Sequence, residues 1–373
     1  MGLLDYYRRY EEIDPAEVNR GLRERRRRER RLALEHVAEL DLSSTEWPEL
    51  PSAEVANAAI ARARGRLNGY PDARAVEVRE LLAARHGLDP SQIALGNGAG
   101  ELMRTAAYLL LAPGDELVTP WPSYPLFPLM ASAAGGRPVA VEIGHGPPSV
   151  AALLDAITPR TRVIVICNPN DPTGSYLPAT DIAALLAQIP EGVHVLLDEA
   201  YAQFQDVEHE DAGLALVHEH PRLFVFRTFS KVYGLSGLRG GYVVASTAAS
   251  SALEALAPVN GVNAMTQAAL AYALRRGDAE VARRRDSVLE GRTRLFGGLA
   301  EMPLEAAPSQ ANFAWLRLPG VTGPDLRARL ERSGIIVAAG GALGDEQHVR
   351  AAVRGSAGVE RLLAGLARAS ASA

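Results

Sequence analysis

Short apolar runs alternate with longer amphipathic segments through the middle of the chain. The run Arg162–Cys167 reads Arg-Val-Ile-Val-Ile-Cys and is almost continuously apolar, which is typical of a parallel strand covered on both faces. We expect strands at 93–95, 116–119, 137–142, 162–167, 194–197, 223–227 and 241–245. Helical patterns at 101–111, 124–133 and 178–189 lie between these strands. The alternation predicts an α/β fold, with a large domain built on a mostly parallel seven-stranded sheet flanked by helices.

The pattern changes towards both ends of the chain. After a long helical region at about 248–300, strands at 312–317, 335–337 and 349–353 with helices at 323–333 and 356–369 indicate a smaller α+β domain. Residues 1–40 are highly charged with a helical pattern. We therefore expect a helical N-terminal arm at 1–40, a joining segment at 41–70, the large domain at 71–275 and the small domain at 276–373.

Composition and charge exclude several classes of protein. The chain has 373 residues, a hydrophobic fraction of 47% and a net charge of -5, which suits a globular protein with a large core and gives no global reason to expect nucleic-acid binding. The Arg-rich stretch 20–31 is interleaved with glutamates, so it is better explained as a solvated helix face or an arm on a second subunit. The single cysteine, Cys167, excludes an intramolecular disulfide and a cysteine metal cluster. Without a signal-peptide core or a membrane-length apolar run, we expect a cytoplasmic protein.

Lysine is used once in this sequence. The chain has 39 lysines and arginines together, and only Lys231 is a lysine. Arginine stays protonated, whereas a lysine amine can lose its proton and attack a carbonyl group. A chain that uses arginine everywhere else is therefore expected to use Lys231 as an amine, and Schiff-base formation is the main reaction that needs one.

Polar segments follow several of the predicted strands. Ligands of an open α/β sheet bind beyond the carboxyl ends of its strands. The segments there are Gly98–Gly100, Asn168–Gly174, Asp198, and Lys231 with Ser230 and Arg239 nearby. The first suits an anion at a helix N-terminus, and Asp198, a carboxylate at the end of a buried strand, implies a cationic partner. A phosphate, a cation and a carbonyl group would satisfy them all, and pyridoxal 5′-phosphate provides the three.

At these residues the sequence resembles a known family. Asn168–Gly174 (Asn-Pro-Asn-Asp-Pro-Thr-Gly), Asp198–Tyr201 (Asp-Glu-Ala-Tyr) and Ser230–Tyr242 resemble the motifs of fold type I, class I/II pyridoxal-phosphate-dependent aminotransferases, nearest the histidinol-phosphate aminotransferase group. The resemblance spans about residues 40–368 and implies the aspartate aminotransferase-like fold.

The resemblance also implies roles for individual residues. Lys231 would form the Schiff base and move the substrate Cα proton, Asp198 would pair with the ring nitrogen, and Tyr201 would bind the ring O3′. The residues expected at the phosphate are Ser230, Arg239, Thr228 and the backbone N–H groups of Ala99 and Gly100. Tyr124 would stack on the ring, and Tyr70 would reach the phosphate of a neighbouring subunit, which implies a homodimer. Arg350 would bind the substrate α-carboxylate in bidentate geometry.

One departure from the family pattern concerns the cofactor. Asp171 stands where the family usually has an asparagine that donates to O3′. An ionised carboxylate cannot donate a hydrogen bond and repels a phenolate oxygen. Either Asp171 is protonated, or it turns away and Asn170 or Tyr201 supplies the donor.

A second departure concerns the substrate. Histidinol-phosphate aminotransferases typically have an arginine for the substrate phosphate just after the segment Gly334–Val337, where this chain has Ala338. A methyl group cannot hold a phosphate, although Arg354 could substitute for the missing arginine. Trp47 falls in the family's substrate-pocket segment, so an aromatic or apolar substrate is plausible. Trp47 could equally serve only in packing.

These observations predict an enzyme that exchanges an amino group between an L-amino acid, or an amino-alcohol phosphate, and a 2-oxo acid by ping-pong kinetics. A genuine histidinol-phosphate aminotransferase is one alternative. A decarboxylase, lyase or cyclase that uses the same cofactor is another, since the sequence does not show which Cα bond breaks. A cofactor-binding regulator that uses the basic arm is the non-enzymatic alternative, and we expect neither a metal, a membrane nor a nucleic acid as partner.

Overall fold

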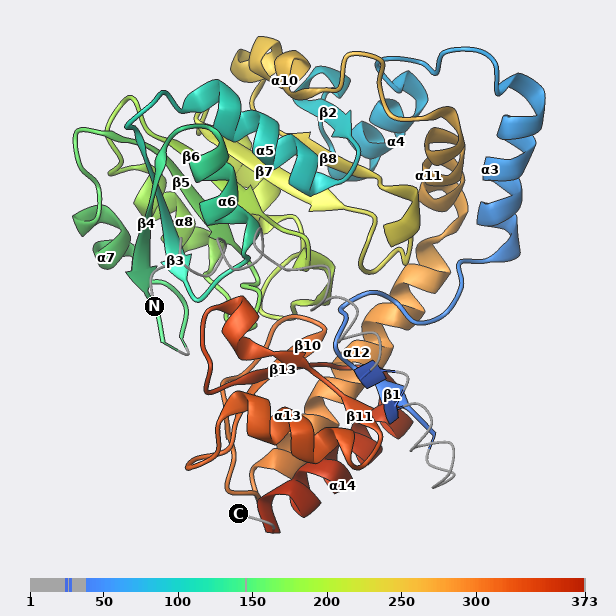
Figure 1. The fold of residues 1–373 in the computed structure, drawn as a ribbon. Helices are drawn as coiled ribbons and strands as arrows, with labels where there is room; N and C mark the ends of the chain where they lie inside the picture. Colours follow the sequence, from blue (N-terminus) through green and yellow to red (C-terminus); the bar gives the residue numbers. More distant parts are fainter. Residues whose placement is uncertain (1–23, 26, 29–37, 145, 372–373) are drawn as a thin grey trace. The chain divides into compact units, whose positions relative to one another are not determined.

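The computed structural model describes residues 24, 25, 27, 28, 38–144 and 146–371 (Figure 1). The expected N-terminal arm at 1–40 lies mostly outside these residues. The chain divides into two compact units. The larger unit holds Glu46–Leu289 and Ser309–Ala311, and the smaller unit holds the residues up to Thr45, Glu290–Pro308 and those from Asn312 onward.

A seven-stranded sheet forms the centre of the larger unit and confirms the expected fold class. Its strands are β2 (Ile93–Gly96), β3 (Glu116–Trp121), β4 (Arg137–Glu142), β5 (Thr161–Cys167), β6 (His194–Asp198), β7 (Leu223–Thr228) and β8 (Gly241–Val244). Their spatial order is β2-β8-β7-β6-β5-β3-β4. Of these seven strands, only β8 runs in the opposite direction to the others. The strands are buried on both faces because helices cover both.

Two hydrophobic clusters lie on the two faces of this sheet. One contains Val163, Val165 and Leu196 and is covered by α5 (Ala99–Leu110), α6 (Leu126–Ala133) and α10 (Ser250–Leu256). The other contains the alternate strand residues, such as Ile164 and Val195. It is covered by α4 (Val76–His86), α8 (Ala179–Leu186) and α11 (Ala264–Arg276). The helix α3 (Ala53–Arg66) packs beside α11 (Figure 1).

The predicted helical region at 248–300 is divided into separate helices. Pro258 and Gly261 lie between α10 and α11, and the Asn263 side chain caps α11 by accepting a hydrogen bond from Thr266 N at 2.9 Å. Gly277 separates α11 from α12 (Asp278–Leu299). The helix α7 (Val150–Asp155) and the single turn α9 (Ala212–Ala215) are additions to the expected elements. Short 3₁₀ turns occur at Pro90–Gln92, Ala202–Phe204, Leu216–His218, Ser236–Leu238, Thr247–Ala249 and Gly340–Leu343.

The smaller unit is an α+β structure, as expected. Its antiparallel sheet has the order β12-β13-β10-β9, formed by β12 (Ala338–Ala339), β13 (Val349–Ala352), β10 (Phe313–Arg317) and β9 (Glu305–Ala306). A separate parallel pair joins β1 (Leu40–Asp41) to β11 (Ile335–Ile336). The helices α13 (Gly323–Glu331) and α14 (Gly355–Ala371) share one apolar core with these strands. The predicted strand at 335–337 corresponds to β11, and β12, which follows it directly in the chain, belongs to a different sheet.

The two compact units of the structure divide the chain after Leu289, whereas the sequence predicts a domain boundary at residue 276. Arg284 Nη1 donates to the Val232 carbonyl at 3.1 Å, and Arg285 Nε donates to the Gln203 carbonyl at 3.0 Å. These contacts fix the first half of α12 to the larger unit, which therefore extends to Leu289. The joining segment expected at 41–70 is also divided between the units, because the larger unit begins at Glu46. Among the described residues, no helix is long and apolar enough to cross a membrane.

Candidate active site

The polar segments predicted from the sequence meet at one edge of the large sheet. The parallel strands β3, β5, β6 and β7 all end at this edge. Because β8 is antiparallel to both of its neighbours, β2 also ends there and β8 begins there. Chain segments far apart in sequence therefore deliver their side chains to a common place, as expected for an open α/β sheet.

Lys231 lies just after the end of β7 and is half-buried. Its Nζ is 5.0 Å from the centroid of the Tyr201 ring, and Tyr201 is itself 3% exposed. The positive charge of Lys231 acts on the carboxylate of Asp198 and lowers its pKa, in opposition to burial. The structure thus brings together the amine, the phenol and the carboxylate that were predicted as the catalytic set.

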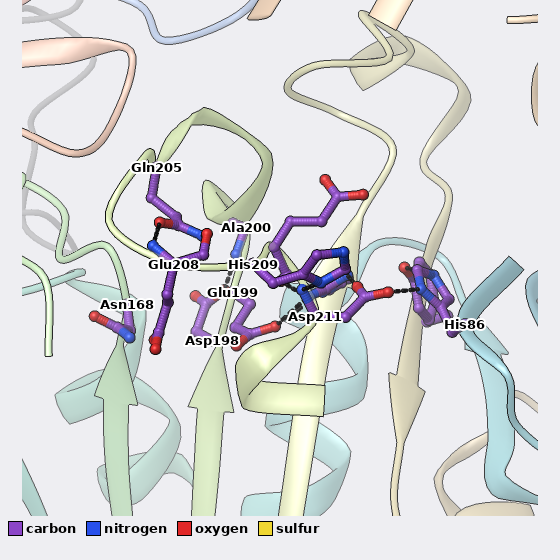
Figure 2. A network of polar contacts seen from close by, with 12 residues as sticks. His86, Asn168, Asp198, Glu199, Ala200, Gln205, Glu208, His209 and Asp211 are labelled. Carbon is purple, nitrogen blue, oxygen red and sulfur yellow. Dashed lines mark hydrogen bonds and ion pairs between the residues drawn. The ribbon is translucent and has the colours of Figure 1, made fainter. Parts of the chain in front are cut away.

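Asp198 is the last residue of β6 and is 3% exposed. Its Oδ1 accepts a hydrogen bond from Ala200 N at 3.1 Å (Figure 2). Burial is the main cause that raises the pKa of Asp198, the Ala200 N–H and Lys231 lower it, and the charge of Asp171 adds to the increase; together these effects place the pKa at about 7. A buried carboxylate of this kind is stabilised by a cationic group, such as a protonated ring nitrogen.

Two hydroxyl groups, a guanidinium and a helix N-terminus form a cradle for an anion. Thr228 Oγ1 donates to Ser230 Oγ at 2.9 Å, and Arg239 Nη1 donates to the same oxygen at 3.5 Å. The helix α5 begins at Ala99, beside this group. A Cβ atom added to Gly98, which has φ 92°, would lie 2.6 Å from Arg239 Nη2. The absence of that Cβ therefore leaves room for Arg239 at the N-terminus of α5.

β8 approaches the same helix end closely. A Cβ atom on Gly241 would lie 2.4 Å from Ala99 N, so only glycine permits this backbone contact. The donors around the cradle fit a phosphate dianion, Asp198 fits a ring nitrogen and Lys231 fits an aldehyde. The residues present therefore match the three functional groups of pyridoxal 5′-phosphate.

The structure settles how the unusual Asp171 is bonded. Tyr201 Oη donates to Asp171 Oδ2 at 2.9 Å, and Asp171 is 3% exposed. Asn170 uses both of its amide hydrogens elsewhere, because Nδ2 donates to the Pro122 carbonyl at 3.0 Å and to Thr173 Oγ1 at 2.9 Å. Which side chain donates to O3′ stays a prediction, and the two bonds above count against Asn170. Its amide instead fixes the conformation of the loop after β5.

Tyr124 lies close to the carboxylates of the site. Its ring is 38% exposed and packs edge-to-face on Phe127, with the centroids 5.7 Å apart. Partial withdrawal from water raises the pKa of its hydroxyl, and the charges of Asp198 and Asp171 add to the effect. One face of the ring can therefore reach a ligand while its edge is held by the core.

Tyr70 and Trp47 are more exposed to solvent than Asp198 and Tyr201. Tyr70 is 82% exposed in the loop between α3 and α4. Trp47 is half-buried, its ring lies 5.1 Å from the Arg284 guanidinium carbon, and its Nε1 donates to Glu49 Oε2 at 3.4 Å. These contacts give Trp47 a packing role within the larger unit.

Three sequence-predicted residues lie in the smaller unit. Arg350, on β13, donates from Nη2 to the Ser43 carbonyl at 3.2 Å, and its guanidinium lies 5.4 Å from the Phe313 ring centroid. Ala338 is its register partner on β12. Arg354 donates from Nη1 to the Asp41 carbonyl at 2.7 Å and from Nη2 to the Ser44 carbonyl at 2.9 Å. Arg354 is therefore engaged in fixing the backbone after β1, which argues against its use as a substitute phosphate ligand.

A buried network of charged residues escaped the sequence analysis. Figure 2 shows Glu199, Asp211 and His86 in a row beside Asp198. The fully buried guanidinium of Arg227 joins Glu199 to Asp211, because Nη2 donates to Glu199 Oε2 at 2.7 Å and Nη1 to Asp211 Oδ1 at 2.6 Å. The sequence carried one sign of it, since Arg227 is a charged residue inside an apolar strand and requires a buried anionic partner.

Comparisons with known proteins agree with this site. The family model "aminotransferase class I and II" matches residues 38–366. An aromatic amino acid aminotransferase of Cutibacterium acnes is 38% identical over 288 residues, which cover 76% of this chain and 79% of that protein. A histidinol-phosphate aminotransferase 2 of Ralstonia nicotianae is 37% identical over 330 residues, which cover 87% of both.

Solved structures agree as well. The histidinol-phosphate aminotransferase of Sinorhizobium meliloti in complex with pyridoxal 5′-phosphate has a TM-score of 0.79 at 26% identity, and the match covers 90% of this chain and 91% of that one. An aspartate aminotransferase of Thermus thermophilus, a single mutant, shares the fold with a TM-score of 0.81 at 23% identity over 98% of both chains. The chain belongs to the class I and II aminotransferases and is an enzyme that uses pyridoxal 5′-phosphate to transfer amino groups.

Proposed function

We propose that the amino donor is an aromatic L-amino acid and that a 2-oxo acid accepts the amino group in the second half of a ping-pong cycle. The observation that carries this proposal is the engagement of Arg354 by the carbonyl groups of Asp41 and Ser44, together with the methyl group of Ala338. Ala338 carries no charge, and the Arg354 guanidinium already donates to two backbone carbonyl groups, which counts against its use for a substrate phosphate. The relatives named aromatic amino acid aminotransferase support an unphosphorylated aromatic substrate.

The residues of the larger unit divide the work of cofactor binding. Ser230, Thr228, Arg239 and the N-terminus of α5 at Ala99 and Gly100 would hold the phosphate. Asp198 would bind the ring nitrogen, and Tyr124 would pack against the ring. Pyridoxal 5′-phosphate, when bound, supplies an aldehyde that condenses with amines and a ring that takes up the electron pair left at Cα.

Proton transfer is the task of Lys231. Its amine would take the proton from Cα of the amino donor and deliver it to C4′ of the cofactor. Asp198, in its ionised form, would keep the ring nitrogen protonated, because a buried carboxylate stabilises a neighbouring cation. The Tyr201 hydroxyl donates to Asp171, so these two residues act as one bonded pair at the site.

We assign binding of the substrate α-carboxylate to Arg350, whose planar guanidinium suits a carboxylate. Trp47 stays a weaker candidate for the substrate pocket, because its contacts are with Arg284 and Glu49.

A substrate panel tests the proposal against histidinol-phosphate transamination. The purified enzyme is incubated with 2-oxoglutarate and, in separate reactions, phenylalanine, tyrosine, aspartate or histidinol phosphate, and the products are identified by mass spectrometry. We expect the aromatic 2-oxo acids to form with the highest kcat/KM. Faster turnover of histidinol phosphate would overturn the proposal, and carbon dioxide or elimination products would indicate a lyase or decarboxylase instead.

A matched variant strengthens this test. In Ala338→Arg, a guanidinium occupies the position where the histidinol-phosphate group of the family carries one. We expect the kcat/KM for histidinol phosphate to rise about tenfold or more, since a charged hydrogen-bonded pair contributes roughly 1.5–3 kcal/mol. An unchanged value would show that residue 338 does not face the substrate phosphate.

We also infer that the enzyme is a homodimer in which Tyr70 contributes to the neighbouring site. The exposure of Tyr70, at 82%, and of Leu67, at 77%, supports this assembly because two large apolar side chains in one loop are more favourable when covered. Light scattering of the purified enzyme tests the mass, and a monomer would contradict the inference.

A cytoplasmic location is consistent with the single, unpaired and buried Cys167. Fractionation of the producing cells tests this location, and recovery outside the cytoplasm would contradict it.

A further inference from the structure

Five buried or half-buried residues form a continuous polar chain next to the cofactor residues. We call Glu199, Arg227, Asp211, His86 and Tyr242 the Arg227 cluster. Glu199 Oε2 accepts from Arg227 Nε at 2.9 Å and from Nη2 at 2.7 Å, and Asp211 Oδ1 accepts from Nη1 at 2.6 Å. Asp211 Oδ2 lies 2.9 Å from His86 Nδ1 (Figure 2). His86 Nε2 lies 3.0 Å from Tyr242 Oη.

The cluster is attached to the strand ends that carry the site. Glu199 directly follows Asp198, and Arg227 directly precedes Thr228. Tyr242 is the register partner of Arg227 on β8. Since successive side chains of a strand point to opposite faces of the sheet, the side chains of Arg227 and Thr228 lie on different faces at the end of β7. The cluster therefore joins the ends of β6 and β7 to the start of β8, behind the residues expected to face the cofactor.

Arg227 is the central member because its guanidinium binds both carboxylates of the cluster, Glu199 and Asp211. It is fully buried, and Nη2 also donates to the Glu210 carbonyl at 2.5 Å. The charges of Glu199 and Asp211 hold the pKa of Arg227 above its ordinary range although burial lowers it. The rigid, planar fork of an arginine can satisfy several acceptors at fixed angles, whereas a lysine ammonium cannot reproduce this pattern.

The packing around the cluster leaves little room for adjustment. A Cβ atom on Gly213 of α9 would lie 1.9 Å from Glu199 Oε1. The Glu199 backbone N–H also donates to the Phe226 carbonyl at 2.8 Å. A shift of the Arg227 side chain therefore has to move Glu199 or its strand, and with it the neighbouring Asp198.

We propose that Arg227 is a positioning residue of the cofactor site, which fixes the distance between the Asp198 carboxylate and the Thr228–Lys231 segment. Its side chain holds Glu199, which directly follows Asp198 at the end of β6. Its backbone belongs to β7 and directly precedes Thr228. Misplacement of a catalytic group by about 1 Å can reduce a rate by about a hundredfold. The fixed geometry of the two strand ends is therefore a requirement for turnover as well as for folding.

Arg227→Lys tests this role, because it keeps the positive charge and removes the planar guanidinium with its several donors. A stability role alone would lower the melting temperature and leave the folded enzyme's chemistry intact. Glu116→Gln is the matched control. Glu116 is fully buried, accepts hydrogen bonds from Thr158, Arg137 and Arg160, and lies at the start of β3, at the opposite end of the sheet from the site. Each holoenzyme is compared by melting temperature, kcat, KM for the amino donor, and the visible circular dichroism of the bound cofactor.

We expect Arg227→Lys to lower kcat by about tenfold to a hundredfold with KM changed less than about threefold, and to alter the visible circular dichroism. Glu116→Gln should lower the melting temperature without either change. If Arg227→Lys keeps the kcat and the visible spectrum of the wild type, the proposal is overturned. Should Arg227→Lys not fold, Glu199→Gln, which keeps the shape of the side chain and loses the charge, decides by the same readouts.

This inference rests on the assignment of Asp198 and Lys231 to the cofactor. Lys231→Ala and Asp198→Asn are therefore measured in parallel. If those two variants keep cofactor binding and activity, the site assignment has failed. If they lose activity while Arg227→Lys and Glu199→Gln do not, only the positioning role of Arg227 has failed.

Discussion

Two buried carboxylates, Asp198 and Asp171, share their surroundings with one lysine. Asp198 and Asp171 are each 3% exposed, and the charge of Asp171 is one of the causes that raise the pKa of Asp198 to about 7. Lys231 and the Ala200 N–H offset only part of this effect. The cofactor-free site is therefore short of positive charge, which a protonated ring nitrogen would supply.

The first prediction concerns the pH dependence of stability. The folded-state pKa of Asp198 is raised from 3.8 to about 7, so the folded protein binds a proton that the unfolded chain has already released. In this window the stability contributed by Asp198 falls as the pH rises, by about 1 kcal/mol per pH unit. Urea unfolding of the cofactor-free wild type and Asp198→Asn, between about pH 4 and pH 8, measures the difference.

The wild type should lose more stability than Asp198→Asn as the pH rises through this window. Loading with cofactor should abolish the difference in slope, because a cationic partner keeps Asp198 ionised. Parallel pH profiles for the two cofactor-free proteins would show that Asp198 is already ionised when buried.

The second prediction concerns Asp171 and its bond to Tyr201. Asp171→Asn removes a negative charge from the site and leaves an amide that can accept from the Tyr201 hydroxyl. A nearby carboxylate stabilises positively charged groups, so its removal should move the midpoint of the cofactor's visible pH titration to lower pH. Tyr201→Phe breaks the same hydrogen bond and keeps the charge, so its midpoint should not fall. Superimposable titrations of the wild type and Asp171→Asn would mean that Asp171 has no influence on the cofactor.

At the scale of elements, the site depends on the close approach of β8 to the start of α5. The third prediction is that Gly241→Ala weakens phosphate binding, because its Cβ would lie 2.4 Å from Ala99 N and 2.6 Å from Gly98 C. Overpacking of this kind costs about 1–3 kcal/mol, so the Kd for the cofactor should rise roughly tenfold or more. Fluorescence titration of the cofactor-free protein measures the Kd.

Gly237→Ala is the control for this change. It lies in the same segment, and no heavy atom would lie within 4 Å of its Cβ. Its Kd should equal that of the wild type. Equal Kd values for Gly241→Ala and the wild type would contradict the proposed cradle.

Individual helices and strands show which parts of this fold could be predicted from the sequence and which could not. The strands of the large sheet were predictable because their residues are buried on both faces, as in Val163–Cys167. Asp198 and Lys231 were found because strand-end chemistry and the family motifs coincide there. The helix α7 was missed because a six-residue segment has too few turns to show a periodicity. The compact units differ from the predicted domains because contacts of Arg284 and Arg285 with distant carbonyl groups assign the start of α12 to the larger unit.

Side-chain pairing was the least predictable part of the site. Arg227 is 28 residues from Glu199, and His86 is 125 residues from Asp211. Partners at such separations are set by the strand order and not by a local pattern. The bonds of the Asn170 amide likewise depend on two acceptors, the Pro122 carbonyl and Thr173 Oγ1, whose proximity a motif does not reveal.

At the scale of the whole molecule, the fourth prediction tests whether sites are shared between subunits. Lys231→Ala destroys its own site and keeps Tyr70, while Tyr70→Phe keeps Lys231 and weakens the site of its partner. After the two variants are mixed and allowed to exchange subunits, each mixed dimer should contain one intact site. Aminotransferase activity at limiting cofactor should therefore rise above that of either parent.

No rise on mixing would show that Tyr70 does not reach a neighbouring site. The stability of Tyr70→Phe serves as a control, because a side chain that is 82% exposed in the chain described here should not contribute to its folding.

The central claim is that Lys231 holds the cofactor, and its amine offers the most direct measurement. Lys231 is the only lysine of the chain, so the loaded enzyme can be reduced with borohydride, digested and searched for the cofactor's mass on any amine. We expect one adduct, on the peptide that carries Lys231, and none in Lys231→Ala. A reduced adduct in the wild type at any other group, or an adduct that persists in Lys231→Ala, would contradict it.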